Sequence, residues 1–177
     1  LRDADRDDRT SRRIRAVREL VSLGAEVLPA CADVSDVEGM RAVLEEARRH
    51  FGPLNGVFHA AGVLKDGPLL GKTPEEVEEV FAPKVHGTLV LDTLLADQEL
   101  DLLVLFSSLS SFIAPAGQVD YVAANAFLDA YSRTGRIEHK LVVKWGVWNG
   151  VGMASEALRA VAAGPARGTG RPPRNPL

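Results

Sequence analysis

The chain has 177 residues, of which 46% are hydrophobic, and a formal net charge of -3 at pH 7. These values fit one globular domain with a core of its own, and the charge offers no basic surface that would favour nucleic acid. The single cysteine, Cys31, excludes an internal disulfide and a cysteine-rich metal site. The N-terminus is charged rather than signal-like and no apolar run approaches membrane-spanning length, which predicts a cytoplasmic protein without a membrane partner.

Helical and strand patterns alternate along the chain. Residues 1–10 are mostly charged, which predicts a disordered lead, and helical spacing then runs from Ser11 to a C-cap at Gly24. A strand is predicted at Glu26–Cys31, with Cys31 as a small core residue. The later predictions are a helix capped by Ser35 or Asp36 and ending near His50, strand Leu54–His59, loop Ala60–Leu70, a helix capped by Thr73 that passes Lys84 to about Leu95 with a bend at Pro83, strand Leu102–Phe106, helix Gln118–Ser132, strand Leu141–Trp145, and helix Ser155–Ala163.

This alternation predicts βαβ units and a parallel sheet in an α/β domain over residues 11–155, followed by a short helix and a disordered Gly/Pro/Arg-rich tail up to residue 177. A dinucleotide-binding fold of this type opens with a strand, a Gly-rich turn and a helix that holds the pyrophosphate. No G-x-G-x-x-G precedes the first helix. We therefore expect a fragment in which the two N-terminal strands and the Gly-rich turn are missing.

The stretch 102–125 carries the candidate chemistry. A buried strand ends in Ser107 and Ser108, and the next helix places Tyr121 and Asn125 on one face. Ligands in open parallel sheets bind at the carboxyl ends of the strands, where these serines lie. Each residue also has an ordinary structural interpretation: a serine as a turn cap, a tyrosine as half-buried packing, and Lys84 as a surface charge.

Six ordered motifs point further than any one of them alone. They are ADVSD (Ala32–Asp36), FGPLNGVFHAAGVLKDG (Phe51–Gly67), APKVHG (Ala82–Gly87), LFSSLSS (Leu105–Ser111), GQVDYVAANAFLDA (Gly117–Ala130) and WGVWNGVGMA (Trp145–Ala154). Over about residues 20–155 the chain resembles the ketoreductase domain of modular polyketide synthases, a branch of the short-chain dehydrogenase/reductases. The resemblance implies a Rossmann-like doubly wound parallel sheet and NADPH as the cofactor.

The resemblance also implies the catalytic roles. Tyr121 corresponds to the proton donor to the ketone oxygen, and Ser108 to the hydroxyl that hydrogen-bonds this oxygen. Lys84 corresponds to the lysine that supports the tyrosine, and Asn125 completes the tetrad. In the wider superfamily the lysine follows the tyrosine by four residues, whereas this branch, like this chain, has lysine and asparagine exchanged. A nearby ammonium favours the phenolate form, which suits a phenol to proton exchange near neutrality.

The resemblance further implies a cofactor site and a stereochemical class. The implied cofactor-binding residues are Asp33 and Val34 beside the adenine, Ala60, Ala61 and Gly62 beneath the ribose, and Gly146 and Val147 near the nicotinamide, with valine in place of the usual proline. Leu64, Lys65 and Asp66 align with a Leu-Asp-Asp motif of ketoreductases that form the D-(R) hydroxyl. Lysine replaces the first aspartate, but Asp66 and the absence of tryptophan at Ile113 still favour the D product.

We therefore expect NADPH-dependent reduction of a β-ketoacyl thioester on an acyl carrier protein, alongside other polyketide synthase domains. An alternative is a truncated, non-catalytic remnant that cannot bind cofactor alone. A third interpretation, a reductase of a free small ketone, is disfavoured by the placement of Lys84 before Tyr121 and of Asn125 after it. The histidines have no ligand spacing, so no metal is expected.

Overall fold

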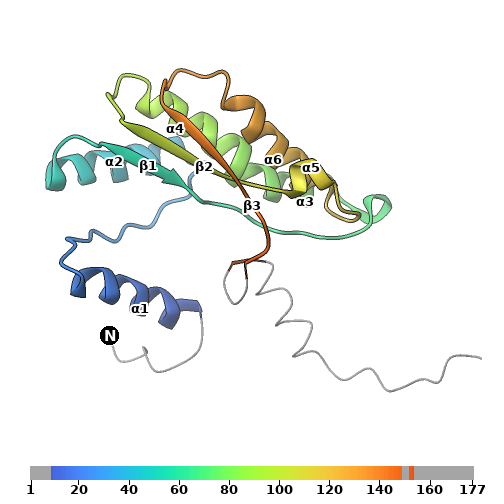
Figure 1. The fold of residues 1–177 in the computed structure, drawn as a ribbon, viewed down its shortest axis with the longest axis horizontal. Helices are drawn as coiled ribbons and strands as arrows, with labels where there is room; N and C mark the ends of the chain where they lie inside the picture. Colours follow the sequence, from blue (N-terminus) through green and yellow to red (C-terminus); the bar gives the residue numbers. More distant parts are fainter. Residues whose placement is uncertain (1–8, 149–151, 154–177) are drawn as a thin grey trace, which may run out of the picture.

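The computed structural model describes residues 9–148 and 152–153 of the chain. Its centre is a three-stranded parallel sheet with the order β1-β2-β3 (Figure 1). The strands are β1 (Gly56–His59), β2 (Leu102–Ser108) and β3 (Lys140–Trp145). The predicted parallel α/β arrangement is thus confirmed, while the predicted helix at 155–163 and the tail lie outside the described residues.

Helices connect the strands as the sequence patterns predict. The structure adds two short helical segments, at Leu69–Gly71 and Ser110–Ile113. The helical elements are α1 (Arg9–Ser22), α2 (Val37–Phe51), the 3₁₀ turn η1 (Leu69–Gly71), α3 (Pro74–Phe81), the π-helix η2 (Ala82–His86), α4 (Gly87–Leu95), α5 (Ser110–Ile113) and α6 (Val119–Tyr131). Two predicted caps are present. The side chain of Asp36 accepts a hydrogen bond from the Glu38 amide, and Thr73 forms a reciprocal capping box with Glu76.

One face of the sheet carries the core. Leucines from α2, α4 and β2 form a single cluster there, together with Tyr131 of α6 and Ile137. Leu103 and Leu105 point into this cluster and are fully buried, as alternation along a strand requires. On the opposite face Phe58 is 70% exposed and Leu141 is 50% exposed, so helix packing among the described residues is confined to one side.

The predicted strand at Glu26–Cys31 is wrong. Residues 25–33 have no regular secondary structure, and Cys31 is exposed rather than a core residue. A strand needs a neighbour to accept its ladder of hydrogen bonds, and the free edge of β1 is not paired with this segment. Helix α1 correspondingly lies apart from the sheet in Figure 1, with Leu20 and Val21 about half exposed.

The bend predicted at Pro83 is a change of helix type. Proline cannot donate a backbone hydrogen bond and its ring crowds the preceding turn. Over Ala82–His86 the helix widens into a π turn, in which the Gly87 amide bonds the Ala82 carbonyl five residues back. Turns of this type inside α-helices are frequent at functional sites, and this one contains Lys84.

Candidate active site

Lys84 is the buried cation of the site. Its side chain lies in the π-helix and the residue is only 3% exposed. The Nζ atom donates a 2.7 Å hydrogen bond to the carbonyl oxygen of Phe106, near the carboxyl end of β2. Burial lowers the pKa of Lys84 from 10.5 to about 8. A lysine with this pKa remains charged at neutral pH but can release its proton readily.

Tyr121 lies beside this lysine. The Nζ atom of Lys84 is 5.8 Å from the centre of the Tyr121 ring, which is within the range of a cation–π contact. Asn125, one helical turn later on α6, is fully buried and its Nδ2 donates a 2.7 Å bond to the Tyr121 carbonyl. Its Oδ1 is buried and finds no hydrogen-bond partner among the residues that the structure describes. Three of the four predicted tetrad members therefore meet between η2 and α6.

Ser108 ends β2 next to this group. Its Oγ accepts a 3.1 Å bond from the Ser110 amide and lies 3.1 Å from the Ser110 hydroxyl. This contact is the turn-capping role expected of a serine after a strand. The Ser110 hydroxyl continues to Oε1 of Gln118, the residue that precedes α6. Short polar contacts thus link Ser108 to the start of the helix that carries Tyr121.

A second polar network connects the end of β2 to α6 and β3. Ser107 and Ser111 both donate to the carboxylate of Asp129 on α6, over 2.9 and 2.7 Å, and Lys144 on β3 lies 3.0 Å from the same carboxylate. Burial acts to raise the pKa of Asp129, but the hydrogen bonds from Ser111, Lys144 and Ser107 outweigh it, so the pKa stays below its ordinary value. The network fixes Ser108 between two anchored serines.

His59 is the last residue of β1 and is 4% exposed. Burial, followed by the charge of Lys84, lowers the pKa of His59 from 6.5 to about 4, against the opposing effect of a hydrogen bond to the Pro83 backbone. The imidazole is therefore neutral, and within the described part of the chain its Nε2 has no hydrogen-bond partner. The expectation of a strand-end residue is confirmed, and no group of three potential ligands that could hold a metal occurs in the described part of the chain.

The residues predicted for the cofactor are placed unevenly. A Cβ atom added to Gly62 would lie 3.2 Å from Cε of Lys84, so this loop passes directly over the buried lysine. Val34 packs on Gly87 of α4. The Asp33 carboxylate accepts two bonds from Ser35 in its own turn, which lowers the pKa of Asp33. Val147 is 76% exposed beyond β3.

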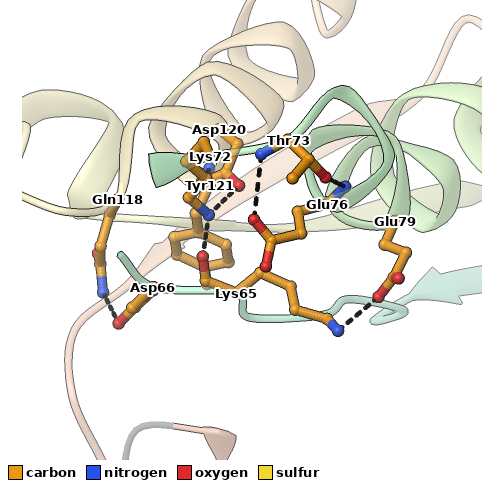
Figure 2. Close-up of polar contacts among 9 residues, drawn as sticks. All are labelled: Lys65, Asp66, Lys72, Thr73, Glu76, Glu79, Gln118, Asp120 and Tyr121. Atoms are coloured by element: carbon orange, nitrogen blue, oxygen red, sulfur yellow. Dashed lines mark hydrogen bonds and ion pairs between the residues drawn. The ribbon is translucent and has the colours of Figure 1, made fainter. Parts of the chain in front are cut away.

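The loop after β1 reaches the start of α6. Oδ2 of Asp66 accepts a 2.8 Å bond from Gln118, and the Gly67 amide donates to the Gly117 carbonyl over 2.9 Å. Lys65 forms a 2.7 Å ion pair with Glu79 on α3 (Figure 2). The side chain that replaces the motif's first aspartate is thus directed away from Gln118, and Asp66 alone faces the start of α6.

Comparison with known proteins identifies this arrangement. A family model described as KR domain matches residues 2–150. The chain is 38% identical over 162 residues to the polyketide synthase PksL of Bacillus subtilis (strain 168), covering 87% of this chain and 4% of that protein. It is 43% identical over 138 residues to the polyketide synthase GfsA of Streptomyces halstedii, covering 77% of this chain and 2% of that protein. The chain belongs to the KR domain family.

Solved structures agree with this assignment. A solved ketoreductase domain from the bacillaene assembly line is 37% identical to this chain, with a TM-score of 0.77. The match covers 89% of this chain and 40% of that structure. A short-chain dehydrogenase/reductase from Burkholderia phymatum, at 22% identity and a TM-score of 0.66, shows the shared fold alone. The predicted Rossmann-like class is confirmed. This KR chain spans only a few per cent of the curated relatives' length and less than half of the similar structure.

Sequence reasoning missed several residues of this KR site. Gln118, Asp120 and Lys72 make contacts around Tyr121 that no motif singles out. Asp120 lies in the first turn of α6, where an acidic residue is common, so it does not stand out in the sequence. The sequence likewise does not show that the side chain of Lys72 is buried. Only their ion pair in the structure marks Lys72 and Asp120 as part of this site.

Within the described part of the chain, no helix combines the length and apolar character that crossing a membrane requires.

Proposed function

We propose that this KR chain is the catalytic portion of an NADPH-dependent β-ketoacyl reductase that acts on a substrate tethered to an acyl carrier protein within a polyketide synthase. The observation that carries the proposal is the buried ammonium of Lys84, fixed to the Phe106 carbonyl and 5.8 Å from the Tyr121 ring. Burying a cation against a neutral carbonyl rather than a carboxylate is costly. Its retention beside a phenol is explained by a role in proton transfer.

The residues divide the work of ketone reduction. The hydroxyl of Tyr121 donates its proton to the ketone oxygen while Ser108 donates a hydrogen bond to the same oxygen. The Lys84 ammonium stabilises the phenolate that remains. Asn125 fixes the first turns of α6 through its bond to the Tyr121 carbonyl, which holds the ring over Lys84. When bound, a reduced nicotinamide supplies the hydride.

The residues present fit one end of that cofactor. Gly62 and its neighbours Ala60 and Ala61 allow close approach of a ribose above Lys84, because any larger side chain at Gly62 would contact the lysine. The unpartnered Asn125 Oδ1 is a buried acceptor in the same layer. No G-x-G-x-x-G occurs in the 177 residues, so they offer no comparable site for the pyrophosphate. We propose that residues 1–177 alone bind NADPH weakly, and micromolar affinity by isothermal titration would contradict this.

The product is proposed to carry the D-(R) hydroxyl. Asp66 survives from the Leu-Asp-Asp motif and bonds Gln118, three positions before Tyr121. Leu64, two residues earlier, is half-buried. This places the motif's remaining acid at the entrance to the helix that bears the proton donor. Chiral chromatography of the hydroxyacyl product tests the assignment, and an L product would reject it.

The activity is tested with a β-ketoacyl N-acetylcysteamine thioester and NADPH. Two samples are compared: the full natural polypeptide that contains the KR chain, called the native polypeptide, and residues 1–177 alone. Oxidation of NADPH is followed by its absorbance, and the hydroxyacyl product is identified by mass spectrometry. Product formation by the native polypeptide supports the proposal. Absence of product there, with cofactor demonstrably bound, rejects it.

The two adjacent serines supply a matched pair. Ser108→Ala removes the hydroxyl proposed to contact the ketone oxygen, and the expected fall in kcat is about a hundredfold. Ser107→Ala removes a hydroxyl committed to Asp129, and we expect a smaller loss of activity together with lower stability. Equal losses of kcat in the two variants would show that the serines act through structure alone.

A second candidate is a non-catalytic remnant of such a domain. The unpaired segment at 25–33 and the open edge of β1 favour it, because a cofactor half without ordered strands cannot fix a dinucleotide. The same assay separates the two candidates. Turnover that appears only in the native polypeptide supports the reductase, and the absence of cofactor binding in both samples supports the remnant.

A further inference from the structure

Lys72 is buried although its sequence context does not mark it. Its side chain is 4% exposed, and that of its partner Asp120 is 1% exposed. The Nζ atom lies 2.5 Å from Oδ2 of Asp120 and also donates to the carbonyl oxygen of Lys65. One ammonium therefore joins three segments: the loop after β1, the short connection between η1 and α3, and the first turn of α6 (Figure 2).

The connection continues to the proton donor. Oδ1, the other carboxylate oxygen of Asp120, accepts a 2.9 Å hydrogen bond from the Tyr121 amide. Hydrogen bonds that involve a charged group are shorter and stronger than neutral ones. The Lys65 carbonyl, Lys72, Asp120 and the Tyr121 backbone thus form one charge-assisted chain. We name the Lys72–Asp120 pair with the Lys65 carbonyl the loop clamp.

Apart from the backbone hydrogen bond from Gly67 to Gly117, the remaining contacts of the loop are exposed side-chain pairs. The bond between Asp66 and Gln118 is exposed to solvent, and the ion pair of Lys65 with Glu79 joins side chains that are 40% and 55% exposed. Exposed pairs contribute little to stability. In Figure 2 these two side chains leave the loop in opposite directions, so neither one holds it against Tyr121 by itself.

The loop also has space into which it could move. A cavity of about 160 Å³ lies between it and the start of α3, lined among others by Pro68, Gly71 and Glu76. The cavity contacts neither Ser108 nor Tyr121, so it is not the reaction site. Without the ammonium of Lys72, the Lys65 carbonyl would lose its donor and the loop could shift towards this space.

We propose that Lys72 is a positioning residue that, through the loop clamp, fixes residues 64–68 relative to Tyr121 and so restricts the acyl chain to one direction of approach. The inference rests on the proposed reductase function. It assigns Lys72 a part in substrate affinity and stereochemical purity, and no part in the proton transfer between Tyr121 and the ketone. A buried ion pair is retained here for its geometry, since such pairs add little net stability over apolar packing.

The test compares two lysines that each bind backbone carbonyls. Lys72→Met keeps an unbranched side chain of nearly the same length and removes the charge. Lys140→Met is the matched control, because Lys140 donates to the carbonyls of Thr134 and Ile137 beyond the far end of α6. Both variants are made in the native polypeptide and assayed with NADPH and a β-ketoacyl N-acetylcysteamine thioester. Steady-state constants and the ratio of hydroxyl enantiomers are measured.

For Lys72→Met we expect KM to rise about tenfold, kcat to change by less than about threefold, and the minor enantiomer to increase about fivefold. Lys140→Met is expected to leave KM and the enantiomer ratio unchanged. If Lys72→Met keeps the parental KM and enantiomer ratio, or if both variants alter them equally, the proposal is overturned.

Hydrogen exchange decides the inference separately from activity. If the parent polypeptide forms no product, the proposed function fails, but amide protection can still be measured. Faster exchange at residues 64–68 and 117–121 in Lys72→Met, but not in Lys140→Met, would support the loop clamp. Unchanged protection of these amides in Lys72→Met would reject it.

Discussion

The layer between β2, η2 and α6 contrasts with the open edge of β1. In the first region the buried polar groups Lys84 and Ser107 have partners, and Asn125 uses its amide nitrogen on the Tyr121 carbonyl. In the second region Phe58 is largely exposed, and residues 25–33 form no strand. Two stretches of one chain, both predicted to be ordered, thus differ in how far they are packed and paired among the described residues.

This difference shows what a catalytic constellation needs. The predicted tetrad residues lie in β2, η2 and α6, and α6 contacts both of the others, so contacts within the described chain hold them in place. A dinucleotide instead spans several strand ends. The described residues therefore build the part of the site proposed for proton transfer more completely than the part proposed for the cofactor. Four predictions test how far this contrast extends.

The largest effect is expected from Tyr121→Phe. The substitution keeps the ring beside Lys84 and removes the proton donor, so kcat for β-ketoacyl thioester reduction should fall about a thousandfold. Steady-state kinetics in the native polypeptide measure this, and an unchanged circular dichroism spectrum confirms the fold. A residual rate within tenfold of the parent would exclude Tyr121 as the donor.

The next prediction compares a core residue with an edge residue directly. Leu105 is fully buried, and Leu105→Ala should lower the free energy of unfolding by about 3–4 kcal/mol. Phe58 is 70% exposed, and Phe58→Ala should change it by less than about 0.5 kcal/mol. Urea denaturation of both variants gives the comparison. A large loss from Phe58→Ala would mean that the edge is covered in solution.

The pH dependence of the free energy of unfolding should show that the ammonium of Lys84 is buried. Its pKa is about 8 in the folded chain and 10.5 as the ordinary value, so the unfolded chain binds more protons between these pH values. Stability should therefore rise with pH in this window. Between pH 7 and 10 the parent should gain about 2–3 kcal/mol relative to Lys84→Met. Parallel urea midpoints for the two proteins across this range would contradict a buried ammonium.

His59 should produce a smaller effect on the acid side. Its pKa is about 4 when folded and 6.5 as the ordinary value, so the unfolded chain binds more protons as the pH falls through 6.5. Between pH 7 and 5 the parent should lose about 2 kcal/mol of stability relative to His59→Gln. Equal acid sensitivity of both proteins would show that the imidazole is accessible to solvent.

The contrast also explains which predictions from sequence succeeded. The helix that carries Tyr121 and the strand ending at Ser108 follow from local patterns, and their packing partners lie within the described chain. The predicted strand at Glu26–Cys31 is also mostly apolar, but a strand exists only when a neighbour pairs with it. Pairing is a property of the assembled sheet, which a local window of sequence does not contain.

Side-chain burial is the other property that the sequence does not predict. Lys84 was found because it lies in an ordered motif, whereas Lys72, with a side chain almost as buried, lies in none. Ser107 and Ser108 are adjacent identical letters whose separate roles follow from the alternating faces of β2. Such assignments require knowing which groups meet, and contacts between distant segments decide that.

The π turn at Ala82–His86 makes the length of its helical segment as important as its composition. Each residue of an α-helix advances the side chains by about 100° around the axis. Removing a single residue between Thr73 and Lys84 would therefore rotate the ammonium away from the phenol, even if every remaining side chain were unchanged. If Lys84 and Tyr121 act as proposed, the spacing of this segment matters for activity, and natural or engineered indels should be tolerated in the loops on either side of it before they are tolerated within it.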